Sequence, residues 1–156
     1  GVSIHTIRHY LDILNGTFMT RLLLPWFENI HKRQTKTPKV YFRDSGILLS
    51  LLRISQEEEL LRHPYLGAIW EGFALEQIIQ KLRLRSEEAF FWRTHHGAEL
   101  DLLVLKGGKR FGYEFKFADA PKTTKSMHIA LSDLQLDHLY VIYPGTREIL
   151  LQDHIT

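Results

Sequence analysis

Three side chains in two adjacent segments have the types and spacing to act on a phosphate. Asp101 lies in one apolar segment, and Glu114 and Lys116 lie in the next, separated by a single residue. Carboxylate oxygens are ligands that Mg²⁺ prefers, and the ion keeps waters and phosphate oxygens in its remaining positions. A neighbouring lysine can orient a water or offset the charge that develops on a phosphate. The three residues are therefore candidates for a Mg²⁺ site that could act on a phosphate.

A two-glycine turn predicts how these segments pair. Residues 99–105 and 110–117 are strand-like, and Gly107-Gly108 between them is a typical hairpin signal. Counting outward from the turn places Asp101 opposite Glu114 on one face of the sheet. Directly opposed residues have Cβ atoms only about 5 Å apart, so two carboxylates there repel each other. The pairing therefore favours a divalent cation between them.

The same count allows an interpretation without chemistry. It places Glu99 opposite Lys116, on the face that carries Asp101 and Glu114. The four side chains would then form a surface ladder of ion pairs, in which Glu99 neutralises Lys116. The spacing alone does not decide between this ladder and a metal site.

A further carboxylate lies on the helix predicted over residues 66–84. At about 100° per residue, Glu71 falls in the middle of an apolar stripe, and Glu76 lies well off it. The stripe consists of Ala74, Leu75, Ile78 and Leu82. A carboxylate on a core-facing stripe is costly without a cation, a metal or hydrogen-bond donors. We expect Glu71 to assist the metal or its water, and the alternative is an ordinary ion pair with a basic residue.

The elements that must position these residues predict an α/β fold. After the helix come strands at 89–93, 99–105 and 110–117, a helix over about 122–136, and strands at 138–143 and 147–151. Helix, three strands, helix and strand form a mixed α/β layer arrangement.

The first 55 residues differ from the rest in charge. They carry eight Lys and Arg against three acids, or +5, whereas residues 56–156 carry twelve against fifteen, or −3. Within this segment the sequence predicts a helix, a strand, a basic loop, a second strand and a short helix, at 3–14, 17–26, 27–38, 39–42 and 46–52. This order is typical of a partial winged helix. We therefore expect two modules, 1–55 and 56–156, joined at the polar run 55–59.

The basic loop and its flanks are candidates for DNA binding. They carry Lys32, Arg33, Lys36, Lys39 and Arg43. Lysine and arginine bind phosphates without sequence preference, so this segment could contact a DNA backbone. A solvated loop, or a docking surface for a preceding domain, explains the same residues equally well. The net charge of the whole chain, +2, gives no support for nucleic-acid binding.

The composition excludes several classes of protein. With 44% hydrophobic and 24% charged residues, the chain has the profile of one soluble globular unit or two small ones. It contains no cysteine, which excludes a disulfide scaffold. The absence of cysteine fits a reducing cytoplasm, where we expect the protein to be. No apolar run approaches the roughly 18 residues of a membrane span, so we expect no membrane contact. Because the chain begins at Gly1 and not at Met, we interpret it as part of a longer protein.

Several stretches together resemble a known family. Glu71, Asp101 and Glu114-Phe115-Lys116 resemble the PD-(D/E)-x-K signature of restriction-endonuclease-like nucleases, although Leu100 and not proline precedes Asp101. Nearly the whole chain is similar to the C-terminal domain of unknown function of bacterial and archaeal AAA-type P-loop ATPases. The matching stretches are 6–11, 39–46, 67–71, 91–93, 99–101 and 113–116.

The resemblance implies a restriction-endonuclease-like core preceded by a partial winged helix. It implies that the catalytic residues are Glu71, Asp101, Glu114 and Lys116, of which the three carboxylates would bind Mg²⁺ or Mn²⁺. The implied partners are DNA and an upstream ATPase domain, through which the protein would form oligomers. The ATP site itself has no counterpart in this sequence, because no P-loop motif is present. The alternative is an inactive module that binds DNA or a protein and regulates the ATPase.

Overall fold

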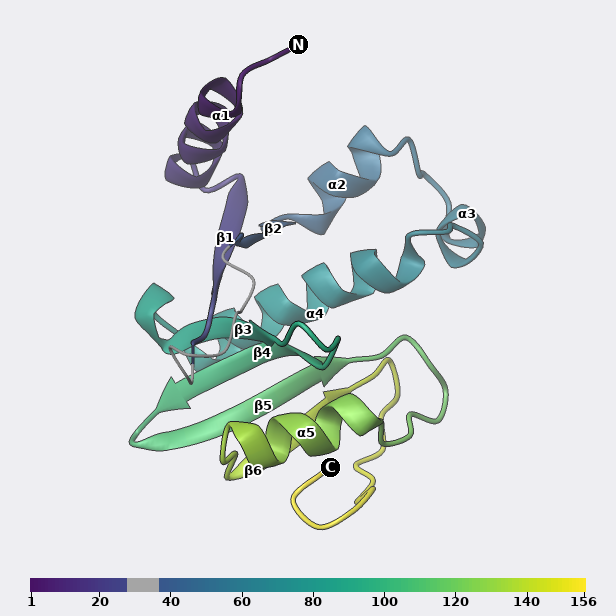
Figure 1. Ribbon diagram of the computed structural model, residues 1–156. Helices are drawn as coiled ribbons and strands as arrows, with labels where there is room; N and C mark the ends of the chain where they lie inside the picture. Colours follow the sequence, from purple (N-terminus) through teal and green to yellow (C-terminus); the bar gives the residue numbers. More distant parts are fainter. Residues whose placement is uncertain (28–36) are drawn as a thin grey trace.

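The computed structural model describes residues 1–27 and 37–156 and has an α/β fold. These residues contain six strands, which form one mixed sheet in the order β2-β1-β3-β4-β5-β6 (Figure 1). The strands are β1 Thr20–Pro25, β2 Lys39–Phe42, β3 Ala89–Arg93, β4 Glu99–Lys106, β5 Lys109–Phe115 and β6 His138–Ile142. The same part of the chain contains five α-helices, α1 Ile4–Gly16, α2 Ser45–Leu51, α3 Glu57–Leu61, α4 Leu66–Leu82 and α5 Lys125–Asp133. A short 3₁₀ helix, Ser86–Glu88, precedes β3.

Strand β1 connects the two parts of the sheet. It pairs antiparallel with β2 and parallel with β3. Strands β3, β4 and β5 then pair antiparallel, and β6 lies parallel to β5. A single sheet therefore includes strands from both of the expected modules. The predicted order of helix, three strands, helix and strand is confirmed by α4, β3, β4, β5, α5 and β6.

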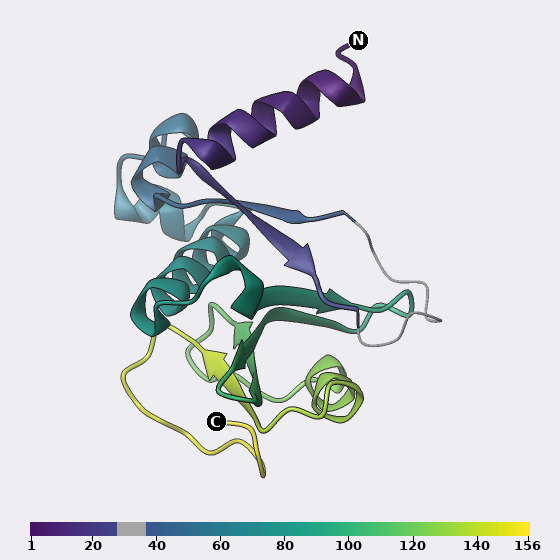
Figure 2. The same ribbon diagram turned by 90° about the vertical axis from the view of Figure 1, so that its left-hand side faces the viewer.

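Helices α4 and α5 cover opposite faces of the sheet (Figures 1 and 2). On the α4 face the buried core includes Leu75, Ile79, Phe91, Leu102, Tyr113 and Phe115. On the α5 face it includes Trp92, Leu100, Leu103, Met127, Leu134 and Leu139. The sheet is therefore buried on both faces along β3, β4 and β5, which explains why β4 is almost continuously apolar.

The β4–β5 hairpin has the predicted register. Lys106 pairs with Lys109, and the ladder continues to Leu102 opposite Tyr113. The turn residues Gly107 and Gly108 have φ of 60° and 74°, which L-residues rarely adopt, so glycine suits both positions. One further step in this register brings Asp101 next to Glu114.

A bulge in β4 changes the surroundings of Asp101. Phe90 pairs with Leu103 but Trp92 pairs with Leu100, so a single residue of β3 faces both Asp101 and Leu102. The paired ladder of β4 with β5 ends at Leu102 and Tyr113, and the Lys116 amide donates to the Ile142 carbonyl of β6 at 2.9 Å. The predicted pairing therefore ends close to the carboxylates.

Three further predictions about elements need correction. The strand expected at 147–151 is not formed, and an isolated bridge from Ile155 to Leu139 joins the following segment to β6 instead. Ile155 is buried whereas Leu150 is exposed, so the later residue provides the apolar anchor. Helix α5 is shorter than the expected 122–136. A short helix, α3, occupies most of the polar run expected as a join.

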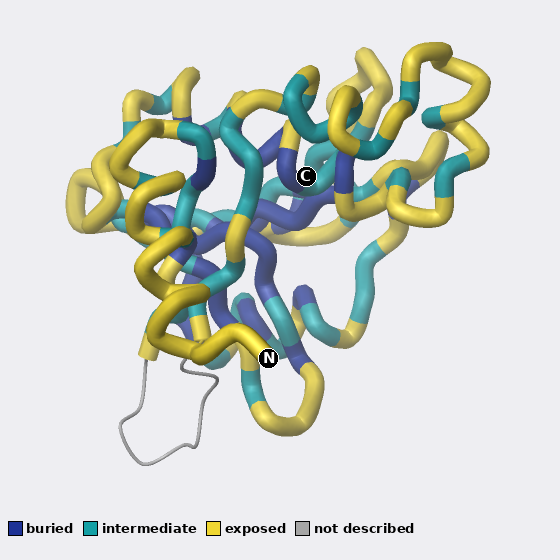
Figure 3. Tube along the Cα trace, turned by 90° about the horizontal axis from the view of Figure 1, so that it is seen from above, coloured by how far each residue is buried: buried dark blue, intermediate teal, exposed yellow. Residues whose placement is uncertain are grey.

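Helix α1 projects away from the sheet (Figure 2), and the burial colours show it as mostly exposed (Figure 3). Ser3 caps it through a hydrogen bond from the Thr6 amide, and none of its residues is buried. Apolar residues of this helix lie open, with Ile4 and Ile7 both exposed. Within the described residues, no helix has the length and apolar character needed to cross a bilayer.

Candidate functional site

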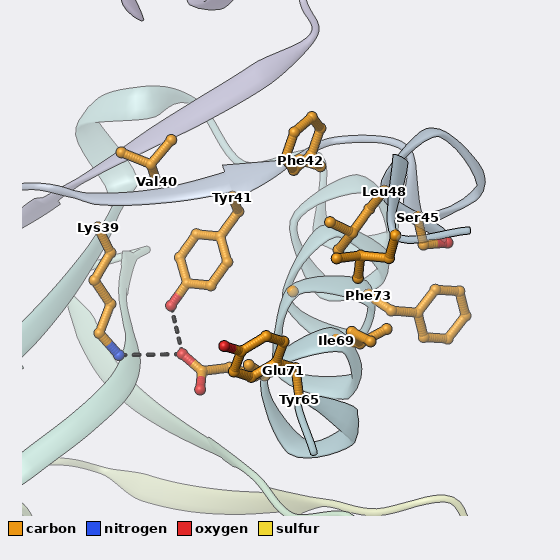
Figure 4. Close-up of a pocket in the computed structure, with 13 residues that line it drawn as sticks. Lys39, Val40, Tyr41, Phe42, Ser45, Leu48, Tyr65, Ile69, Glu71 and Phe73 are labelled. Carbon is orange, nitrogen blue, oxygen red and sulfur yellow. Dashed lines mark hydrogen bonds and ion pairs between the residues drawn. The ribbon is translucent and has the colours of Figure 1, made fainter. Parts of the chain in front are cut away.

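Strand β2 and helix α4 bring Glu71 next to two polar side chains. Glu71, in the second turn of α4, accepts hydrogen bonds through Oε1 from the Tyr41 hydroxyl at 2.5 Å and the Lys39 ammonium at 3.1 Å (Figure 4). Lys39 and Tyr41 are two residues apart in β2, so both side chains point to the same side of the strand. Burial and the neighbouring Glu71 raise the pKa of Tyr41, so its hydroxyl keeps the proton that it donates.

The Lys39 ammonium lies among three carboxylates. Its Nζ is 3.1 Å from Glu71 Oε1, 2.5 Å from Glu99 Oε1 and 3.6 Å from Asp101 Oδ1. Burial alone would lower the pKa of this ammonium, but the three carboxylates outweigh it and raise the pKa of Lys39. Lys39 therefore stays protonated and carries a positive charge at the centre of the site. Arg93 reaches Glu99 from the exposed side, with Nε 3.6 Å from Oε2.

Asp101 is buried and has an unusual pKa. Its Oδ2 accepts a hydrogen bond from the Phe115 amide of β5 at 3.0 Å. Burial raises the pKa of Asp101 to about 7, with further contributions from Glu114 and Glu71. The Phe115 amide and Lys39 oppose this shift only in part. The charged form of Asp101 thus lacks sufficient stabilisation at neutral pH.

Glu114 is also buried, and its carboxylate is only half satisfied. Its Oε1 accepts a hydrogen bond from the Lys116 ammonium at 2.7 Å. Its Oε2 is buried and has no hydrogen-bond partner among the described residues. Burial raises the pKa of Glu114, and Lys116 counteracts this only in part. A buried oxygen without a partner is costly, so an additional cation or donor would stabilise it.

The four predicted catalytic residues thus belong to one cluster with unequal numbers of charges. The four carboxylates of Glu71, Glu99, Asp101 and Glu114 lie beside three cationic groups, which are the ammonium groups of Lys39 and Lys116 and the guanidinium of Arg93. The alternative ladder is wrong in its pairing, because Glu99 pairs with Lys39 and Arg93, and Lys116 pairs with Glu114. In the part of the chain that the structure describes, no three His, Asp or Glu side chains form a ready-made metal ligand set.

Two residues of this cluster have roles that the sequence did not predict. Lys39 was expected to contact DNA, and Tyr41 had no assigned role. Lys39 and Tyr41 are separated by Val40 in a strand, so the sequence places both on one side of β2. It does not identify the residues that this side contacts. Their partner Glu71 lies on a different element, so only the packing of β2 against α4 reveals the contact.

Of the other residues predicted to bind DNA, the structure describes only Arg43. Lys32, Arg33 and Lys36 fall outside the described residues. Arg43 donates from Nε to the Thr20 carbonyl at 3.1 Å, and its guanidinium lies 5.3 Å from the centre of the Phe18 ring. DNA binding by the basic segment stays a prediction.

A cavity of about 520 Å³ adjoins the cluster between β2, α2 and α4 (Figure 4). Lys39, Tyr41 and Glu71 line its polar end. The remaining wall is largely apolar and aromatic and includes Phe42, Leu48, Tyr65, Ile69 and Phe73. The carboxylate cluster therefore borders an open cavity on the side where Lys39 lies.

The family described as a domain of unknown function, DUF4143, matches residues 66–156, which is more than half of the chain. The chain belongs to this family. A second domain of unknown function, DUF8612, matches residues 1–58. Lys39 and Tyr41 come from the DUF8612 segment, whereas all four carboxylates and Lys116 come from the DUF4143 segment. The cluster is therefore completed by residues from outside the part that matches DUF4143.

Relatives of this DUF4143 chain are longer proteins. The uncharacterized proteins Rv2008c of Mycobacterium tuberculosis and Mb2031c of Mycobacterium bovis are each 45% identical to it over 150 residues. The match covers 96% of this chain but only 34% of each relative, so the chain spans about a third of their length. It corresponds to their C-terminal part. No solved structure matches the chain.

Proposed function

We propose that this chain is a restriction-endonuclease-like, metal-dependent phosphodiesterase that acts on DNA as the C-terminal part of a larger AAA-type ATPase. The observation that carries the proposal is the buried pair of Asp101 and Glu114 on neighbouring strands. Both carboxylates have a raised pKa, and Glu114 Oε2 has no hydrogen-bond partner among the described residues. Perturbed, incompletely partnered carboxylates of this kind are typical of functional sites.

The donors in the cluster fit a hard cation, because all of them are carboxylate oxygens. Asp101 and Glu114 would hold Mg²⁺ or Mn²⁺, and Glu71 would assist. Such an ion neutralises charge on a phosphate and makes a bound water more acidic. Lys116, whose Nζ lies 2.7 Å from Glu114 Oε1, would position the attacking water and offset charge on the phosphate.

The arrangement of elements also supports the proposal. Helix α4, strands β3 to β5, helix α5 and strand β6 follow the order expected for a restriction-endonuclease-like core. Helix α1, strands β1 and β2 and helix α2 follow the order expected for a partial winged helix. In this proposal the first segment contacts DNA through its basic residues while the second segment carries the chemistry.

A cleavage assay tests the proposed activity. The chain is incubated with linear, branched and single-stranded DNA in Mg²⁺ or Mn²⁺, together with Lys116→Ala and Glu114→Gln. We expect cleavage by the wild type that both variants lose. Lys109→Met, which removes an exposed lysine in the β4–β5 hairpin, is the matched control and should cleave normally. Cleavage that survives Lys116→Ala would contradict the assignment.

A second candidate function is an inactive module that binds DNA or a protein and regulates the ATPase. The observation that favours it is Lys39, whose ammonium already neutralises part of the charge on Glu71, Glu99 and Asp101. Calorimetry with Mn²⁺ separates the two functions. Absence of binding at millimolar Mn²⁺ would favour the inactive module, whereas binding that Glu114→Gln weakens would favour the enzyme.

A further inference from the structure

We propose that Lys39 is a built-in cation that competes with the divalent metal, so that metal binding displaces its ammonium from Glu71 and Asp101. The inference deepens the proposed function and rests on it for the presence of a metal. In this proposal Lys39, which belongs to the first segment, lowers the metal affinity of carboxylates that belong to the second segment.

The contacts of Lys39 carry the first step. Its Nζ contacts three carboxylates at 3.6 Å or less, and two of them belong to the proposed metal ligands. A metal ion on Asp101 would share this carboxylate with the ammonium, and two positive charges at such short range repel each other strongly. Simultaneous occupancy at the present position of Lys39 is therefore disfavoured.

The second step is that the surroundings of Lys39 have room for its displaced side chain. Its side chain is 24% exposed and lines the cavity of about 520 Å³ beside the cluster. A lysine has a flexible stem and a compact charge, so it can leave one partner for solvent without a change in the backbone. An arginine pair fixed by two parallel hydrogen bonds would be much harder to displace.

Tyr41 carries the third step, because it keeps Glu71 in place when Lys39 leaves. Its hydroxyl donates to Glu71 Oε1 independently of the ammonium. Its ring packs against α4 so closely that a Cβ built on Gly72 would lie 3.3 Å from Tyr41 Cδ1. Tyr41 is therefore a positioning residue for Glu71, and Lys39 is the exchangeable partner.

Metal affinity tests the competition directly. Lys39→Met keeps most of the stem and removes the charge, and Mn²⁺ binding is measured by calorimetry and by the thermal shift that Mn²⁺ produces. We expect Lys39→Met to bind Mn²⁺ about tenfold or more tightly than the wild type, since a like charge within about 4 Å has been removed. Lys39→Arg, which keeps the charge, and Lys109→Met, which removes a distant lysine, should show no gain.

Amine labelling of the wild type tests the displacement without any substitution. The chain is acetylated briefly with and without saturating Mn²⁺, and the modification of Lys39 is quantified by mass spectrometry relative to Lys109. We expect Mn²⁺ to increase the relative labelling of Lys39, because its ammonium leaves the carboxylates. Labelling that stays unchanged or falls would overturn the inference.

The outcomes separate this inference from the proposed function. If neither the wild type nor Lys39→Met binds Mn²⁺, both the metal-dependent activity and the competition are wrong. If both bind Mn²⁺ with equal affinity, or the variant binds more weakly, the competition is wrong and the metal site stands.

Discussion

Arg21 of β1 and Glu76 of α4 are 55 residues apart in the sequence and form an ion pair with two hydrogen bonds. The guanidinium Nε donates to Glu76 Oε1, and Nη2 donates to Oε2 at 3.1 Å. Both side chains are largely buried, with 12% and 3% of their surfaces exposed. The pair therefore joins the first segment of the chain to the helix that carries Glu71.

Removal of one partner from this pair should destabilise the fold. Glu76→Leu leaves the Arg21 charge buried without its carboxylate, which we expect to lower the free energy of unfolding by about 3–5 kcal/mol. The double variant Arg21→Met/Glu76→Leu should recover most of that loss, because no unpaired charge stays behind. Urea denaturation measures both. Glu87→Ala, which breaks an exposed ion pair with Arg85, should cause no measurable change.

The buried carboxylate of Asp101 predicts a pH dependence of stability. Its folded-state pKa of about 7 lies above the ordinary 3.8, so between these values the folded state holds a proton that the unfolded state has lost. Without metal, this group should therefore make the protein less stable as pH rises from about 4 to 7. Asp101→Asn should flatten the decline and be more stable than the wild type at pH 8 by at least about 1 kcal/mol.

Urea titrations in EDTA at pH 4 and pH 8 measure this difference. Asp12→Asn removes an exposed carboxylate from α1 and serves as the control. If the free energy of unfolding of both Asp101→Asn and Asp12→Asn changes with pH as in the wild type, then folding does not raise the pKa of Asp101.

The contact between Lys116 and Glu114 predicts a second effect of pH. Lys116→Met removes the ammonium that donates to Glu114 Oε1 and should raise the pKa of that buried carboxyl further, since Lys116 opposes the effect of burial in the wild type. We expect a loss of about 1–3 kcal/mol at pH 8 and a smaller loss at pH 5, where Glu114 can hold a proton. Adding Glu114→Gln should remove the pH dependence of the loss. An equal loss at both pH values would mean that the two groups are not coupled.

Replacement of glycine by alanine should have opposite effects on stability at two positions. A Cβ on Gly112 of β5 would lie 2.7 Å from Leu136 Cδ1 and 3.3 Å from Leu100, within the core on the α5 face. Gly112→Ala should therefore lower the free energy of unfolding by about 1–3 kcal/mol. Gly67 of α4 has no atom within 4 Å of such a Cβ, and Gly67→Ala should raise stability by up to about 1 kcal/mol. Thermal unfolding of the two variants shows whether the signs differ.

Local signals in the sequence were sufficient for several elements. Asp44 caps α2 through a hydrogen bond from the Ile47 amide at 3.0 Å, and β2 and β3 have the predicted bounds. The Gly107-Gly108 turn set the hairpin register correctly. These features depend on hydrogen bonds and backbone conformations within a few residues, so the sequence pattern contains the information that they require.

Other features depended on neighbours that no local pattern identifies. Glu76 lay off the predicted apolar stripe of α4, yet it is buried, because Arg21 of β1 covers a second side of that helix. The β4 bulge arises in the pairing with β3, so the hairpin with β5 did not reveal it. The expected strand at 147–151 failed because Ile155, not the earlier apolar residues, is the one that packs on β6.

The sequence by itself determined the α/β order of elements and the candidate residues Glu71, Asp101, Glu114 and Lys116. The tertiary structure decided which charges meet. Lys39 contacts carboxylates of both α4 and β4. Glu99 pairs with Lys39 and not with Lys116, which pairs with Glu114. The physical reason is the separation along the sequence of the residues that interact. Helix periods, caps and turns are set by neighbouring residues, whereas Lys39 and Glu71 are 32 residues apart and meet only because β2 packs beside α4.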